Sequence, residues 1–342
     1  KSHLMLTKHR VRMKSLKELT DRLKHGPSDC TGIDIGSTAI KLVRLRGSGS
    51  DVTLVGAEIL EPSVTNLSIP PRLRARHAAI AVSGTNAVAK LLTFPGAADA
   101  GFEGRLHKSL GVAEEDDFRI SYRVISEGQG RAESRALAVA LPQAEADPVM
   151  QHFASGIPAP YSLEIAPLAT LTAFEHGPVA ANPDQAMGLI DFGTARTTLS
   201  FFHRGALVLM RQFDFGSRDI LQRVESTLHV DTETAQGILV DSAFDISELL
   251  GELMSPVTTQ FVVSRDFVER RDNCSDIALF AIGGIALSRA TLGELEQTLS
   301  TDIAGWNPFD NLNVQTQSVD DRIGADSWRF ASAIGAALSA LE

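Results

Sequence analysis

Cysteines and clustered metal ligands are scarce in this sequence. The 342 residues include two cysteines, Cys30 and Cys274, which lie far apart in the chain. This pattern excludes a disulfide framework and a cysteine-based metal site. The nine histidines form no HxxxH or CxxH cluster, so a metal ion bound by side chains alone is not expected.

Long apolar runs and an excess of positive charge are also lacking. The longest nearly uninterrupted apolar stretch, residues 277–287, is too short to cross a bilayer, and no early segment resembles the apolar core of a signal peptide. We therefore expect a cytoplasmic protein without a transmembrane segment. The 32 basic residues are outnumbered by 42 acidic ones, and the formal net charge of −10 disfavours nucleic acid as a partner.

The remaining composition is that of a globular protein. Apolar residues make up 44% of the chain and charged residues 22%, and the length predicts two or more lobes. Residues 1–27 stand apart as a basic N-terminal extension, in which Leu16, Leu19 and Leu23 have the spacing of a short amphipathic helix. A solvated helix, a non-native extension and a contact with anionic lipid or a partner all stay open for it.

Two segments far apart in the chain share one pattern of a strand, an aspartate, a glycine turn and a returning strand. In the first half the predicted strands are residues 32–35, 40–45 and 52–60, and in the second half they are residues 187–191, 197–202 and 206–213. Three antiparallel strands at the start exclude a simple Rossmann unit, because that unit would place a helix after the first glycine turn.

The repeated hairpin carries residue types that bind phosphate. Glycine lets the backbone approach an anion with successive amides pointing at it, and an aspartate at a strand end suits Mg²⁺ held through water. Lys41, on the returning strand, is placed to neutralise phosphate charge. One such hairpin is a common turn, but its repetition favours ATP binding. The candidate residues are Asp34, Gly36, Ser37, Thr38 and Lys41 in the first hairpin and Asp191, Gly193 and Thr194 in the second, with Asp34 and Asp191 as the Mg²⁺ ligands.

Two further features complete the candidate site. A predicted strand at residues 277–282 ends at Gly283 and Gly284, and paired glycines before a helix allow close approach of a purine or ribose. Glu164, which precedes a predicted helix, is the candidate catalytic residue that would position a water molecule, although a simple helix-start carboxylate stays an alternative. The sequence suggests no second substrate site, which favours at most a slow ATPase or a nucleotide-gated scaffold.

Motifs spread along the chain resemble those of a known family. They are Thr-Gly-Ile-Asp-Ile-Gly-Ser-Thr-Ala-Ile-Lys at residues 31–41, Ala-Val-Ser-Gly at 81–84 before Phe94-Pro95, Asn-Pro-Phe at 307–309 and Phe-Ala-Ser-Ala-Ile-Gly-Ala-Ala-Leu at 330–338. The chain is similar to PilM-type pilus assembly proteins, relatives of FtsA within the actin, Hsp70 and sugar-kinase superfamily. The resemblance implies an α/β, actin-like (RNase H-like), two-lobed ATPase fold with an inserted 1C subdomain of the FtsA and PilM kind. The implied subdomains are 1A at residues 28–88, 161–186 and 326–342, 1C at residues 89–160, and 2A and 2B at residues 187–325.

The resemblance also implies a function. PilM-like proteins are cytoplasmic ATP-binding scaffolds of type IV pilus or related secretion platforms, so we expect docking of the cytoplasmic tail of a PilN-like inner-membrane protein. Through that partner the chain would be linked to platform proteins and motor ATPases, and self-association stays open. A small-molecule kinase and an FtsA-like filament-forming protein are the alternatives on the same fold.

Two segments depart from the family pattern. Residues 234–239 lack the acidic and basic side chains of the usual Ala-Glu-x-x-Lys run, with Gln236 and Leu239 in their place, and Ile285-Ala286 replace a glycine and a serine in the purine loop. Weak or absent ATP binding therefore stays open as well.

Overall fold

A computed structural model describes residues 26–49, 51–62, 67–96, 102–113, 117–128, 133–153, 156, 158–241, 245–284, 288–315, 323–324 and 326–342. Within these residues the chain forms two compact units. Unit 1 holds the described residues up to Pro178 together with those from Pro308 to Glu342, and unit 2 is Val179–Asn307. Most of the predicted basic extension, residues 1–25, lies outside the described residues. The predicted subdomain boundaries stay a prediction.

The main sheet of unit 1 has six strands in the order β14-β3-β2-β1-β4-β8. The first three strands of the chain form antiparallel pairs, and β4 and β8 continue the sheet in parallel, which confirms the predicted three-stranded start. The strands are β1 (Asp29–Ile35), β2 (Ile40–Ser48), β3 (Asp51–Leu60), β4 (His77–Val82), β8 (Ala159–Ile165) and β14 (Asn313–Val314), with the short 3₁₀ helix η1 (Pro71–Leu73) before β4.

Strand β8 is a strand that the sequence did not reveal. Its apolar residues alternate with Pro160, Ser162 and Glu164, but a proline inside the segment argues against a strand by local rules. In the described sheet it pairs with β4 alone, and an edge strand tolerates a proline because its outer backbone groups need no partner strand.

Two helices pack closely together against the main sheet. They are α4 (Ala166–Phe174), which continues into the π-helical turn η2 (Glu175–Val179), and α10 (Ala331–Leu341), which follows the 3₁₀ helix η4 (Ser327–Phe330). A Cβ atom at Gly335 of α10 would overlap the carbonyl of Ala169 in α4, and one at Gly32 of β1 would overlap the carbonyl of Ala333. The glycines of the motifs at 31–41 and 330–338 therefore permit the close approach of α10 to both neighbours.

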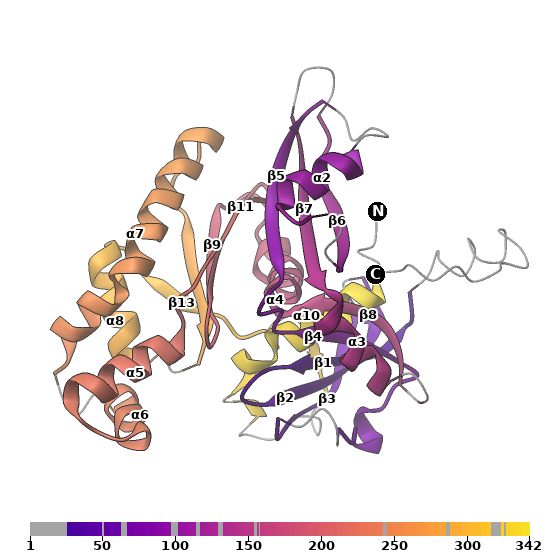
Figure 1. The fold of residues 1–342 in the computed structure, drawn as a ribbon, viewed down its shortest axis with the longest axis horizontal. Helices are drawn as coiled ribbons and strands as arrows, with labels where there is room; N and C mark the ends of the chain where they lie inside the picture. Colours follow the sequence, from indigo (N-terminus) through magenta and orange to yellow (C-terminus); the bar gives the residue numbers. More distant parts are fainter. Residues whose placement is uncertain are drawn as a thin grey trace, which may run out of the picture. The chain divides into compact units, whose positions relative to one another are not determined.

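A smaller sheet within unit 1 has its own core. Its order is β5-β7-β6, and helix α2 lies beside it (Figure 1). The elements are β5 (Val88–Pro95), α2 (Phe102–Leu110), β6 (Phe118–Ser126), β7 (Glu133–Pro142) and α3 (Gln143–His152). Phe94, Phe102 and Leu106 pack in this core against small alanines of β7. These residues form the small α+β core that was predicted between residues 89 and 160.

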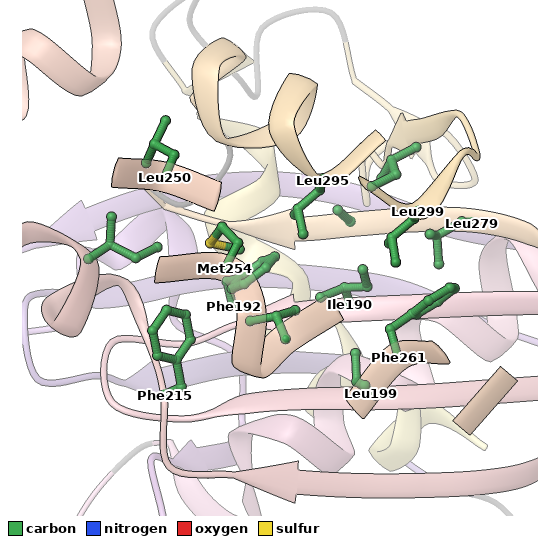
Figure 2. Packing of buried hydrophobic residues seen from close by; sticks show 14 of the residues in the cluster. Ile190, Phe192, Leu199, Phe215, Leu250, Met254, Phe261, Leu279, Leu295 and Leu299 are labelled. Carbon is green, nitrogen blue, oxygen red and sulfur yellow. The ribbon is translucent and has the colours of Figure 1, made fainter. Parts of the chain in front are cut away.

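Unit 2 is a five-stranded sheet with the order β11-β10-β9-β12-β13 and four helices that pack against it. Figure 2 shows Ile190, Phe192 and Leu199 of the sheet meeting Met254 and Phe261 of the longest helix in the buried core. The elements are β9 (Met187–Phe192), β10 (Thr197–His203), β11 (Ala206–Phe213), α5 (Ser217–Leu228), α6 (Thr232–Asp241), α7 (Ser247–Asp272), β12 (Ala278–Gly283), α8 (Arg289–Leu299) and β13 (Ile303–Gly305).

The two units repeat one topology. In unit 1 the order β3-β2-β1-β4-β8 places the first three strands antiparallel and the next two parallel, and β11-β10-β9-β12-β13 does the same in unit 2. This duplicated order is that of the actin-like, RNase H-like α/β fold, which confirms the predicted fold class. No helix in the described ranges combines the length and apolar character that crossing a bilayer requires.

Candidate nucleotide-binding site

The two predicted hairpins have the same backbone geometry. The amide of Gly36 donates to the carbonyl of Ala39 at 3.2 Å, and the amide of Gly193 donates to the carbonyl of Arg196 at 2.9 Å. The turns are followed by equivalent cross-strand pairs, Asp34 with Lys41 in one unit and Asp191 with Thr198 in the other. The repeat seen in the sequence is therefore a repeat of structure, which places each aspartate at the end of the first strand of its sheet.

In the first hairpin, Lys41 is bound to Asp34. The Lys41 Nζ atom lies 3.0 Å from Asp34 Oδ2, and only 13% and 8% of the two side chains are exposed. A Cβ atom at Gly36 would lie 2.7 Å from the same Nζ atom, so the ammonium group sits over the glycine turn, and Ser37 and Thr38 are exposed beside it. Lys41 is thus close to the place where a phosphate would meet the turn, but it also balances the charge of the proposed Mg²⁺ ligand Asp34.

In the second hairpin, helix α5 fixes the orientation of the turn. The amides of Ser217 and Arg218 donate to the carbonyls of Gly193 and Thr194, each at 3.0 Å. In a trans peptide the N–H points opposite to the C=O, so the amides of Thr194 and Ala195 point away from α5. Two successive amides directed to one side form the kind of concave donor site that binds anions.

The close contact between the second turn and α5 depends on a glycine. A Cβ atom at Gly216 would lie 2.5 Å from the carbonyl oxygen of Thr194, and the Gly216 amide donates to Asp219 Oδ2 at 2.8 Å. The sequence analysis did not predict this contact. Asp219 could have indicated it, because an acidic residue in the third position of a helix commonly accepts a hydrogen bond from the backbone before the helix.

Gly283 lies next to the second hairpin in the sheet. The last residues of β12 pair with β9 as Ile282 with Asp191 and Gly283 with Phe192. Gly283 has φ +144°, and a Cβ atom there would lie 2.6 Å from the Phe192 carbonyl oxygen, so only glycine fits. Gly284 follows directly, whereas the predicted purine-loop residues Ile285 and Ala286 lie outside the described residues.

Glu164 is a buried strand residue rather than a helix-start carboxylate. It lies in β8, before α4 begins at Ala166, and it shares one row of the sheet with Ala81 and Asp34. Two strand spacings separate it from Asp34, a backbone distance of about 10 Å. Its Oε1 atom is buried with no hydrogen-bond partner among the described residues.

The environment of Glu164 favours its protonated form. Burial raises the pKa of this carboxyl to about 7, against the opposing effects of a hydrogen bond to Ser339 and the charge of Arg123, while Glu342 acts in the same direction as burial. A carboxyl with a pKa near neutrality can exchange protons under physiological conditions. Its role in positioning water stays a prediction.

Helix α6 corrects one part of the sequence interpretation. Gln236 is exposed, but Leu239 is fully buried in the core of unit 2. Position 239 therefore faces the core and not a ligand, so its lack of a positive charge says nothing about nucleotide binding. Gln236 alone remains at a position from which a side chain can reach out of the unit.

The residues present fit a bound phosphate group better than a metal held by protein alone. Backbone amides and Lys41 supply donors and positive charge to an anion. No group of three or more histidine, cysteine, aspartate or glutamate side chains suited to a metal ion is found in the described part of the chain. A Mg²⁺ ion would therefore depend on water and phosphate oxygens in addition to an aspartate, as this ion commonly does.

Comparisons with known proteins identify the variant of the fold. No protein-family model matches the sequence. Among solved structures, a "PilM-PilN type IV pilus biogenesis complex" superposes with a TM-score of 0.77 at 18% identity, covering 92% of this chain and 100% of that chain. A Bacteroides thetaiotaomicron protein with an actin-like ATPase fold (TM-score 0.46, 7% identity, 90% of this chain and 97% of that one) and a ROK hexokinase from Thermus thermophilus (TM-score 0.44, 12% identity, 91% and 98%) are too distant to carry an argument. This chain thus shares the fold of that structure over 92% of its length.

Proposed function

We propose that this protein is a PilM-like, ATP-binding scaffold of a type IV pilus or related secretion platform. It docks the cytoplasmic tail of a PilN-like inner-membrane protein and is held at the cytoplasmic side of the membrane through that partner. The observation that carries this proposal is the superposition on the PilM–PilN complex, which covers 100% of the matched chain and 92% of this one. Platform proteins and motor ATPases would be reached indirectly.

The nucleotide part of the proposal rests on the two hairpins. Phosphate is contacted from unit 1 by Gly36, Ser37, Thr38 and Lys41 and from unit 2 by Gly193 and Thr194. The nucleoside is approached by Gly283 and Gly284. Asp34 and Asp191 hold the hydration shell of Mg²⁺, an ion that neutralises phosphate charge when bound. Glu164 orients water in a slow hydrolysis of ATP.

The partner interaction can be tested with one peptide. The N-terminal cytoplasmic tail of the PilN-like protein from the same genome would be titrated into the full chain by calorimetry, with a scrambled tail as the control. Because a short tail gains affinity from its sequence-specific contacts, saturable binding of the native tail alone would support the scaffold proposal. Failure of the native tail to bind, with and without Mg·ATP, would refute it.

The nucleotide interaction needs a separate titration. Mg·ATP would be titrated into the wild type and into Asp34→Ala, which removes one of the two proposed aspartates. Saturable binding that is weakened in the variant would support the site. An absence of binding at millimolar nucleotide would leave a scaffold that acts through protein partners alone.

A further inference from the structure

Each hairpin carries one cation near its aspartate, but at a different position. In the first hairpin the cation is Lys41, opposite Asp34 in the ladder, and the turn ends in Ala39. In the second hairpin the residue opposite Asp191 is the uncharged Thr198, and the turn ends in Arg196. The positive charge thus lies on the returning strand in the first hairpin and at the end of the turn in the second.

We propose that Arg196 binds the terminal phosphates of the nucleotide, and that Asp214 holds its guanidinium group in the absence of ligand. This inference rests on the proposed nucleotide binding. It assigns to Arg196 in unit 2 the electrostatic role that Lys41 has in unit 1. Arg196 directly precedes β10, in which Thr198 pairs with Asp191, so it lies two residues from the position opposite that aspartate.

The contact between Arg196 and Asp214 is suited to exchange. Arg196 Nε lies 2.7 Å from Asp214 Oδ1, with 37% of the arginine side chain and 81% of the aspartate side chain exposed. Ion pairs this exposed contribute little to stability, so a phosphate can replace the carboxylate at little cost. Phosphate matches the planar guanidinium group as well as carboxylate does and carries more charge.

The backbone around Arg196 supplies further donors. The carbonyls of Gly193 and Thr194 are bonded to α5, which directs the amides of Thr194 and Ala195 away from that helix. A guanidinium group carried by the same turn as such a pair of amides combines charge with directed hydrogen bonds. This combination recognises phosphate and has no group that reads a base, so we expect Arg196 to discriminate by phosphate number.

The test compares ATP with AMP in four proteins. Calorimetric titrations with excess Mg²⁺ would use the wild type, Arg196→Gln, Arg196→Lys and the control Arg204→Gln, which removes an exposed arginine from the opposite end of β10. We expect Arg196→Gln to weaken ATP binding about tenfold and to leave AMP binding within about twofold, with Arg196→Lys in between and the control unchanged. Thermal unfolding would confirm that all four proteins fold alike.

A fifth variant tests the competing carboxylate. Asp214→Asn should tighten ATP binding about twofold, because the guanidinium group no longer exchanges one anion for another. If the wild type binds ATP but Arg196→Gln keeps the wild-type ratio of ATP to AMP affinity, the role of Arg196 is overturned while nucleotide binding stands. If the wild type binds no ATP at millimolar concentration, both proposals are overturned together.

Discussion

Replacing Glu164 with glutamine should remove a pH dependence from the stability of the protein. The carboxyl is buried in β8 under α10, and burial raises its pKa from 4.5 to about 7. The folded protein therefore holds this proton more tightly than the unfolded chain does. The stabilisation is fully present below about pH 4.5 and is lost as the pH rises through about 7.

The magnitude follows from the two pKa values. A tenfold difference in proton affinity is worth about 1.4 kcal/mol, so the step from 4.5 to about 7 corresponds to at most about 3 kcal/mol between acidic and alkaline conditions. Glutamine keeps the shape and can still bond to Ser339, but it cannot ionise. The free energy of unfolding of Glu164→Gln minus that of the wild type should therefore increase by about 2–3 kcal/mol from pH 5 to pH 8.

The assay is urea unfolding of both proteins across that pH range. The wild-type curve alone is insufficient, because His176 titrates nearby: burial opposes its charge, but its bonds to Glu342 and Thr172 raise its pKa, so its contribution is also lost as the pH rises. The difference between wild type and variant isolates Glu164. Ser339→Ala serves as the matched second variant. Loss of the hydroxyl raises the pKa of Glu164 further, so the free energy of unfolding of this variant should fall more between pH 5 and pH 8 than that of the wild type. A difference that is equal at pH 5 and pH 8 would refute the reasoning.

The remaining substitutions test packing at single positions by thermal and urea unfolding. Gly335→Ala should destabilise the protein by about 1–3 kcal/mol, because the new methyl group overlaps the carbonyl of Ala169. Gly237→Ala, in α6 with open space around it, should instead stabilise by about 0.5–1 kcal/mol, and equal effects at the two glycines would contradict this contrast. Leu239→Lys should cost about 3–5 kcal/mol by placing a charge in the core of unit 2, whereas Gln236→Lys on the exposed face of the same helix should change the stability by less than about 0.5 kcal/mol.

The strand pattern and the repeated hairpin could be predicted from sequence because both depend on local rules. Alternating apolar residues, glycine turns and the aspartate at the strand end recur at residues 29–60 and 187–213, and the structure confirms the strands there. In these segments, local periodicity and the tertiary fold favour the same conformation.

Features that depend on contacts distant in sequence escaped prediction. Pro160 argues against a strand at β8 by local rules, and only the edge position beside β4 makes it acceptable. The burial of Leu239 follows from how α6 packs in unit 2. The bonds from the start of α5 to Gly193 and Thr194 join segments more than twenty residues apart. The pairing of Lys41 with Asp34 could have been predicted from the sequence, because a four-residue turn places these two residues opposite each other.

The ion pair in the first hairpin limits how strongly Asp34 attracts a metal ion. Lys41 balances the charge of Asp34 directly, with its Nζ atom 3.0 Å from Asp34 Oδ2. A carboxylate already paired with an ammonium group attracts the hydration shell of a divalent cation less strongly. We therefore expect Lys41→Gln to increase the Mg²⁺ dependence of ATP binding, measured as the ratio of affinities with Mg²⁺ and with a chelator. An unchanged ratio in this variant would refute a competition between Lys41 and Mg²⁺ for Asp34.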